Sequence, residues 1–160
     1  MDREKVEAYW RAYLSTSLAG SALRDEGYEA WAFGDGPKMA DELGGLVLAR
    51  RKTATCSALW ELEAGGEQIA QTGEKSVILD GNDEPLCIIE TTEVELRPFD
   101  GVDGRFAHEE GEGDRSLEYW RGAHRRFFSR TLPEIGHRFS ENMPLVCERF
   151  RVIYRQNLYS

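Results

Sequence analysis

The segment between residues 76 and 96 constrains the fold of this chain more than any other. Two β-like runs, residues 76–80 and 85–96, are separated by Asp80-Gly81-Asn82-Asp83. Residues of these types favour tight turns, and runs of this length joined by such a turn form hairpins. The segment therefore predicts two antiparallel strands.

The remaining periodic segments surround this hairpin. Apolar residues spaced three and four apart predict amphipathic helices, over residues 3–17, 37 to about 50, and 115–130. Alternating apolar residues predict two further strands, over residues 53–59 and 145–154. Helices around a few irregularly spaced strands indicate an α+β fold, and we expect a small mixed or antiparallel β-barrel flanked by helices.

The 160-residue length fits one domain. We expect a helical extension over residues 1–30 and a barrel core over residues 31–155, with an inserted helix at about 115–130. No segment has the roughly 18 apolar residues of a membrane helix, and no signal-peptide pattern is present at the N-terminus. A cytoplasmic location is therefore expected, with three cysteines kept reduced in the core.

The charge balance limits the possible partners. The chain has 29 acidic and 20 basic residues, a formal net charge of -9. This excludes a protein that coats nucleic acid non-specifically, because such proteins need a broad cationic face. The three histidines form no HxH or HxxxH pair. We therefore predict no metal site and no cofactor.

Three consecutive cations, Arg50, Arg51 and Lys52, stand out in this acidic chain. They fit the negative end of the helix that precedes them. They also precede Thr53 and Thr55, whose side chains lie on one face of a strand because they are two residues apart. A lysine beside a threonine is also an arrangement that binds a phosphate or an oxyanion. Both interpretations are open.

Two further segments have alternative interpretations. Residues 108–114 are acidic and predict either a solvated loop before a helix or a functional site, with a general base or a metal. Arg121 and Arg125 lie one turn apart on the predicted helix over 115–130. They form either a solvated face or part of a cationic groove.

Five segments stand out in this order: WAFGDGP, LVLARRKTAT, TGEKSVILDGNDEPLCIIETTEVEL, FAHEEGEGDRSLEYWRGAHRRFF and MPLVCERFRVIY. Together, and in this order, they resemble the ASCH-domain proteins, members of the PUA-like β-barrel group. The signature of that family is GxKxxTxR. Lys52 and Thr55 match it, whereas Arg50 stands where glycine is usual and Ser57 where arginine is usual.

The resemblance implies a cleft that binds RNA, a nucleotide or a nucleoside. Some small members are similar to amidohydrolases that deacylate N4-acylated cytidine with a Lys, a Thr and a Glu. By motif these are Lys52, Thr55 and Glu110, with Glu109 as the alternative register. The residues that the resemblance implies for binding of the substrate or RNA are Trp31, Phe33, Arg50, Arg51, Ser57, Arg121 and Arg125.

In the implied reaction, the Thr55 hydroxyl attacks the amide carbonyl. Lys52 accepts the hydroxyl proton or, if charged, stabilises the oxyanion. Glu110 orients Lys52 or delivers a proton to the leaving amine, and Trp31 or Phe33 stacks on the base. The alternative is a single-stranded RNA-binding module or a ribonuclease that uses the same cationic cleft. Neither DNA nor a membrane is an expected partner, and the oligomeric state is left open.

Overall fold

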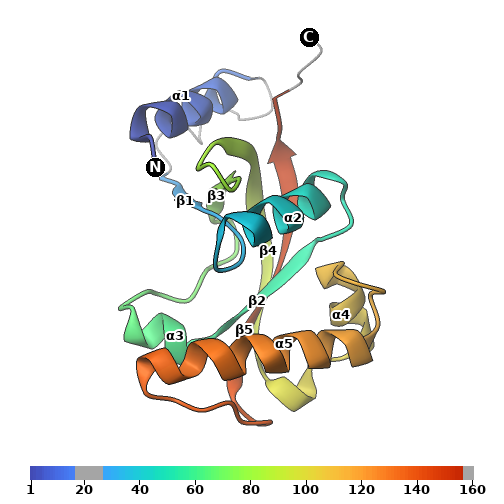
Figure 1. The fold of residues 1–160 in the computed structure, drawn as a ribbon. Coiled ribbons are helices and arrows are strands. Elements are labelled where there is room, and N and C mark those ends of the chain that lie inside the picture. Colours follow the sequence, from blue (N-terminus) through green and yellow to red (C-terminus); the bar gives the residue numbers. More distant parts are fainter. Residues whose placement is uncertain (17–26, 157–160) are drawn as a thin grey trace. The chain divides into compact units, whose positions relative to one another are not determined.

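The computed structural model describes residues 1–16 and 27–156 (Figure 1). Residues 17–26 of the predicted N-terminal extension and residues 157–160 lie outside the described part. The helices are α1 (Arg3–Leu14), α2 (Pro37–Leu48), α3 (Leu59–Ala64), α4 (Gly104–Glu110) and α5 (Leu117–Thr131). The strands are β1 (Glu29–Trp31), β2 (Ala54–Ala58), β3 (Lys75–Leu79), β4 (Pro85–Pro98) and β5 (Pro144–Tyr154). Within the described residues, none of the helices has the length and apolar content needed to span a membrane.

The strands form one mixed, five-stranded half-barrel sheet in the order β1-β3-β4-β5-β2. β1 pairs with β3 in parallel, while the β3–β4 and β2–β5 pairs are antiparallel. The predicted hairpin is confirmed as β3 and β4. Its turn is held by the Asp80 carboxylate, which accepts hydrogen bonds from the backbone of Asn82 (2.8 Å) and Glu84 (3.0 Å). The predicted α+β class is also confirmed.

The chain divides into two compact units, and β4 and β5 contribute to both. The first comprises Met1–Arg50, Gly73–Thr91 and Phe150–Ser160. In it, the apolar side of α2 packs on the hairpin strands and the end of β5, through Leu43, Val47, Ile78, Cys87 and Phe150. A buried lysine of this unit, Lys75, pairs with Glu90 (3.3 Å), which also pairs with Arg151 (2.8 Å).

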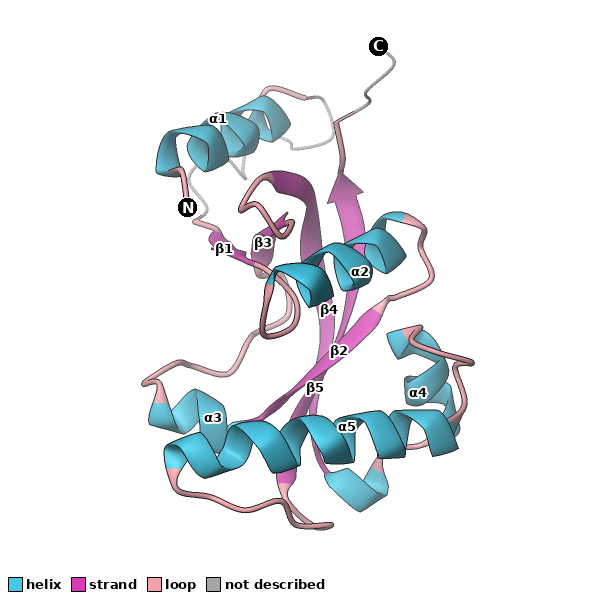
Figure 2. Ribbon diagram, viewed as in Figure 1, coloured by secondary structure: helices cyan, strands magenta, loops and turns pink. Residues whose placement is uncertain are grey.

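The second unit comprises Arg51–Thr72 and Thr92–Arg149. Within it, α4 contacts α5, and α3 contacts the short 3-10 turn that follows α5 (Figure 2). The helices and strands enclose an aromatic-rich core whose fully buried members include Phe99, Phe106, Trp120, Phe128 and Leu132. β2 contributes Ala54 and Ala58 to this core.

The sequence patterns did not predict α4, which replaces part of the expected acidic loop. The helix begins at the N-cap Asp103, whose carboxylate accepts a hydrogen bond from the Phe106 backbone at 2.9 Å. It ends at Gly111, which has a left-handed φ of 78°. Residues 108–110 are therefore its last turn, and Glu110 is buried instead of solvated.

Candidate functional site

Lys52 and Glu110 lie together in the second unit. Lys52 immediately precedes β2, Glu110 ends α4, and only 2% and 1% of the two residues are exposed. Lys52 Nζ donates to the backbone oxygens of Ala54 (2.9 Å) and Glu110 (3.4 Å) and lies 3.7 Å from Glu112 Oε2. The structure therefore brings together Lys52 and Glu110, two of the three residues to which the resemblance assigns catalytic roles.

The loop after α4 is fastened to the residues around Lys52. Thr53 donates its backbone N–H to the Glu109 oxygen at 2.7 Å. The Arg51 guanidinium donates to the oxygens of Gly111 and Gly113, both at 3.0 Å. Gly111 must be a glycine here, because a Cβ would lie 2.4 Å from the Arg51 oxygen. Arg51, predicted to bind RNA or substrate, thus holds the loop that follows Glu110.

The Glu110 carboxylate is surrounded by donors and cations. Its Oε2 accepts from Trp120 Nε1 at 2.8 Å and lies 3.0 Å from His124 Nε2. Burial alone would raise the pKa of Glu110, but the charges of Lys52 and His124 and the hydrogen bonds of His124 and Trp120 lower this pKa to about 2. Glu110 is therefore a carboxylate at neutral pH.

Two more side chains complete the cluster. The His124 ring stacks on Trp120 with the ring centres 4.2 Å apart, and its Nδ1 lies 2.9 Å from the Trp120 backbone oxygen. Burial works to lower the pKa of His124, but the Glu110 carboxylate outweighs it and raises this pKa. Burial, followed by the charge of Glu110, raises the pKa of the Cys56 thiol well above its usual value. Cys56 is therefore an unreactive thiol.

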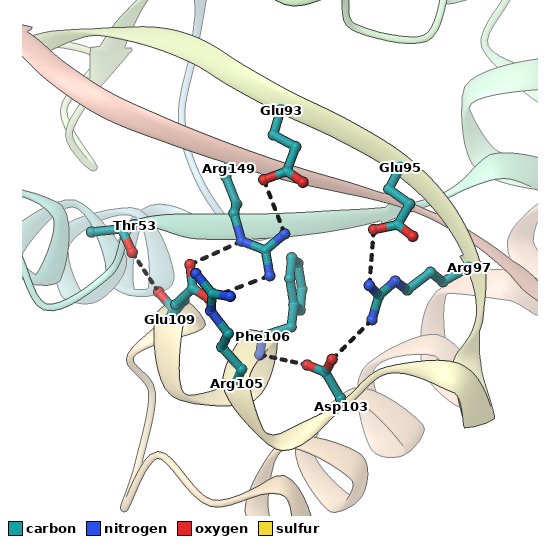
Figure 3. A network of polar contacts seen from close by, with 9 residues as sticks. All are labelled: Thr53, Glu93, Glu95, Arg97, Asp103, Arg105, Phe106, Glu109 and Arg149. Atoms are coloured by element: carbon teal, nitrogen blue, oxygen red, sulfur yellow. Dashed lines mark hydrogen bonds and ion pairs between the residues drawn. The ribbon is translucent and has the colours of Figure 1, made fainter.

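Glu109, the alternative register for the site carboxylate, belongs to a different network (Figure 3). Its carboxylate accepts from Arg149 at 2.9 and 3.3 Å and pairs with Arg105 at 3.2 Å. Arg149 also pairs with Glu93 at 3.2 Å. The geometry therefore places Glu110, and not Glu109, beside Lys52.

Thr55 and Ser57 lie on the other face of β2 from this cluster. Ala54, Cys56 and Ala58 face the core of the second unit. Since side chains alternate along a strand, Thr55 and Ser57 face the opposite side, where both are partly exposed. Of the expected Lys-Thr-Glu set, Lys52 and Glu110 are thus buried together, while the Thr55 hydroxyl lies on the opposite, more accessible face of β2.

The predicted stacking residues belong to the core of the first unit. Phe33 is 4% exposed and packs against Phe150 and edge-on against Trp31, with ring centres 5.9 and 4.7 Å apart. Stacking of Phe33 on a base is not compatible with this position, because the ring already fills the core. Trp31 is half-buried at the end of β1.

The predicted cations differ in their surroundings. Arg125 on α5 is exposed and pairs with Glu141 at 2.5 Å. Arg121 is exposed and forms no ion pair with any residue that the structure describes. Arg50 is exposed and follows the α2 C-cap Ala49 with a φ of 60°.

One group of described residues has the donor atoms of a metal site: Cys56, Glu110 and His124, whose ligand atoms lie within 4.8 Å of one another. Histidine spacing could not predict it, because the three residues come from three separate elements. Trp120 and His124 were likewise not singled out as site residues. Their positions four apart on α5 put them on one helix face, and that spacing was the signal available.

Comparisons with known proteins agree with this architecture. The model of the ASCH-domain family matches residues 29–154. The crystal structure of an ASCH domain from Lactobacillus crispatus is similar, with 35% identity, a TM-score of 0.87, and coverage of 95% of this chain and 96% of that one. A protein from Enterococcus faecalis has 39% identity, a TM-score of 0.83, and coverage of 93% and 88%. A comparison with curated proteins finds no match. The family match and these two structural likenesses show that the chain belongs to the ASCH-domain family, with its PUA-like fold.

Proposed function

We propose that this protein is an amidohydrolase that removes the acyl group from N4-acylated cytidine or a similar small modified nucleoside. The observation that carries the proposal is the burial of Lys52 and Glu110 side by side: they are 2% and 1% exposed, and Lys52 Nζ donates to the Glu110 backbone oxygen at 3.4 Å. Burying charged groups is a poor source of stability, because desolvation offsets the attraction between them. Buried charged groups cluster at functional sites. Lys52 matches the family signature, and the resemblance assigns Glu110 to the same site.

The surroundings of Glu110 favour one of the two roles that the resemblance allows. A carboxyl with a pKa of about 2 has no proton to deliver at neutral pH. Glu110 therefore orients Lys52 and balances its charge. The Lys52 ammonium is then the group that stabilises the oxyanion formed on the acyl carbonyl.

Thr55 is the nucleophile in this proposal, acting from the accessible face of β2. Its Oγ1 forms an ester with the acyl group as the amide C–N bond breaks. The departing N4 nitrogen gains one proton and the Thr55 hydroxyl loses one, so the exchange of protons balances. Water then hydrolyses the ester, so that the products are cytidine and a carboxylic acid.

The distribution of charge supports a small neutral substrate over a long polyanion. Several arginines of the second unit are already committed to protein oxygens: Arg51, Arg97, Arg125 and Arg149. The chain as a whole has a net charge of -9. A neutral nucleoside is not repelled by this charge, whereas a polyphosphate chain is.

The test measures hydrolysis of N4-acetylcytidine by chromatography of the released cytidine. We expect activity in the wild type and a loss of at least about 100-fold in kcat/KM for Lys52→Met. Lys75→Met is the matched control, because Lys75 is equally buried and paired with a glutamate in the first unit. We expect this control to keep full activity per folded molecule.

Thr55→Val and Thr53→Val separate the nucleophile from its neighbour. Thr55→Val removes the attacking oxygen and is expected to lower kcat/KM by at least about 100-fold, while Thr53→Val retains activity. Absence of hydrolysis in the wild type, or equal losses in Lys52→Met and Lys75→Met, contradicts the proposal.

Single-stranded RNA binding is the second candidate function, since ASCH domains are generally associated with RNA. The observation that favours it is the exposed face of α5, where Arg121 and Arg126 have no ion pair among the described residues. Phosphate contacts from these arginines would weaken as salt rises.

A further inference from the structure

Both ring nitrogens of His124 lie within hydrogen-bond distance of oxygen atoms. Nδ1 is 2.9 Å from the backbone oxygen of Trp120, and Nε2 is 3.0 Å from Glu110 Oε2. A carbonyl oxygen only accepts, so Nδ1 must carry a proton to make its bond. A neutral imidazole would then present a bare lone pair to the Glu110 carboxylate.

The environment of Glu110 decides where the second proton lies. Glu110 Oε2 already accepts from Trp120 Nε1 at 2.8 Å, and the Lys52 ammonium lies close by. These groups are donors, which favour a carboxylate without its proton. The proton between Glu110 and His124 is therefore on Nε2.

We infer that His124 is a positioning residue: it carries a proton on both ring nitrogens and, together with Lys52, holds Glu110 between two cations. The helix geometry sustains this arrangement, because Trp120 supplies both a donor to Glu110 and an acceptor for His124 from one turn of α5. The ring stacking of Trp120 and His124 keeps the imidazole plane aligned.

Charged and titratable groups from five segments act on His124 or on the carboxylate that faces it. They are Lys52 before β2, Cys56 in β2, Glu110 in α4, Glu112 in the following loop and Cys147 in β5. The two carboxylates raise the pKa of His124 against the effect of burial. Both thiols have raised pKa values, mainly through burial, so they add no charge near neutral pH.

The contribution of His124 to the stability of the fold depends on pH in a known direction. A histidine whose pKa is raised in the folded state stabilises the fold fully below its unfolded pKa of about 6.5, and this contribution is lost as pH rises through the folded pKa. Above that point Glu110 loses one of its two cationic neighbours. The Glu110 carboxylate is then held by the Trp120 hydrogen bond and the charge of Lys52 alone.

A divalent metal at Cys56, Glu110 and His124 is the competing use of the same atoms. It requires Nε2 without a proton and places two positive charges beside the Lys52 ammonium. The donors already bound to Glu110 favour the protonated ring over the metal, and the experiment below separates the two.

The experiment is a pH titration of protein labelled with 15N in its histidine rings, followed by NMR without substrate. We expect one ring with both nitrogens protonated at pH about 7, in the range where an unperturbed histidine is mostly neutral. This signal should vanish in His124→Gln. It should remain in His137→Gln, the matched control, since His137 also stacks on a tryptophan, Trp60.

Two outcomes overturn the inference. One is a His124 ring with a single N–H at pH about 7. The other is stoichiometric uptake of added Zn²⁺ at pH about 7 that removes the Nε2 proton signal and is abolished by Cys56→Ser. Unchanged ring signals on addition of Zn²⁺ support the protonated ring.

The effect of His124 on the pH profile of kcat/KM rests on the proposed function, whereas the protonation of the His124 ring does not. With N4-acetylcytidine, kcat/KM should fall on the alkaline side of the wild-type pH profile. In His124→Gln, which keeps an N–H donor but has no titrating charge, this fall should disappear. If the wild type is inactive but its His124 ring is doubly protonated, only the proposed substrate is rejected. If the pH profile of kcat/KM is the same in the wild type and in His124→Gln, the positioning role of His124 is rejected.

Discussion

The position of Arg50 shows how a family signature can have a structural reason. Arg50 follows the α2 C-cap with a φ of 60°, and its N–H donates to the Val47 oxygen at 3.0 Å. Glycine is favoured at this position after a helix because it has no Cβ to clash in the left-handed conformation. The glycine that is usual here therefore serves the helix end, and a close approach of ligand to backbone is not needed to explain it.

We predict that Arg50→Gly raises the free energy of unfolding by about 0.5 to 1 kcal/mol, because it relieves the left-handed strain. Urea denaturation measures the change. Ala49→Gly is the matched control: Ala49 has a right-handed φ of -78°, so the same new residue should destabilise the protein by up to about 1 kcal/mol. Destabilisation by Arg50→Gly would show that the arginine side chain stabilises the fold by more than the strain costs.

At the scale of elements, the segments with a clear period or a turn signal were predictable, and three short elements were not. Helices α2 and α5 and strands β3, β4 and β5 agree with the predicted ranges within a few residues. β1, α3 and α4 have three, six and seven residues. Such short elements show too little periodicity to be recognised, and tertiary contacts stabilise them. For α4, the only local signals were its caps, Asp103 and Gly111.

The candidate site was likewise predictable only in part. The motif predicted Lys52, Thr55 and Glu110 from sequence alone, but burial of Glu110 depends on α4 and α5 packing together. The roles of Trp120 and His124 follow from that packing. The burial of Phe33 has a related cause, because its packing against Trp31 and Phe150 depends on tertiary contacts that no sequence pattern shows.

The turn from α4 into its loop gives a prediction at this scale. Gly111→Ala places a Cβ 2.4 Å from the Arg51 oxygen as well as in the left-handed region. We expect it to lower the free energy of unfolding by at least about 2 kcal/mol, through strain and steric displacement. Gly136→Ala is the control, because Gly136 has a similar φ of 79° with no atom within 4 Å of the new Cβ.

For Gly136→Ala only the conformational penalty of about 1 kcal/mol is expected. Thermal or urea denaturation of both variants measures the difference. Equal losses would mean that the loop moves away from Arg51 at little cost, and that the loop contacts around Lys52 are loose.

At the scale of the whole molecule, net charge separates the two candidate functions. The chain has an excess of nine acidic residues, and many of its arginines are paired within the protein. Binding of RNA depends on release of counterions from phosphates and therefore falls steeply with salt. Binding of a neutral nucleoside has no such dependence, because no phosphate charge is neutralised.

We therefore predict that kcat/KM for N4-acetylcytidine changes less than about twofold between about 50 and about 500 mM NaCl, while any binding of a single-stranded RNA oligonucleotide is lost over this range. Filter binding and the cytidine assay, run in the same buffers, measure both. The double variant Arg121→Ala, Arg126→Ala should leave the hydrolysis unchanged. If hydrolysis instead falls with salt as steeply as RNA binding, and if the double variant lowers both, then RNA is the substrate and the exposed face of α5 is its binding surface.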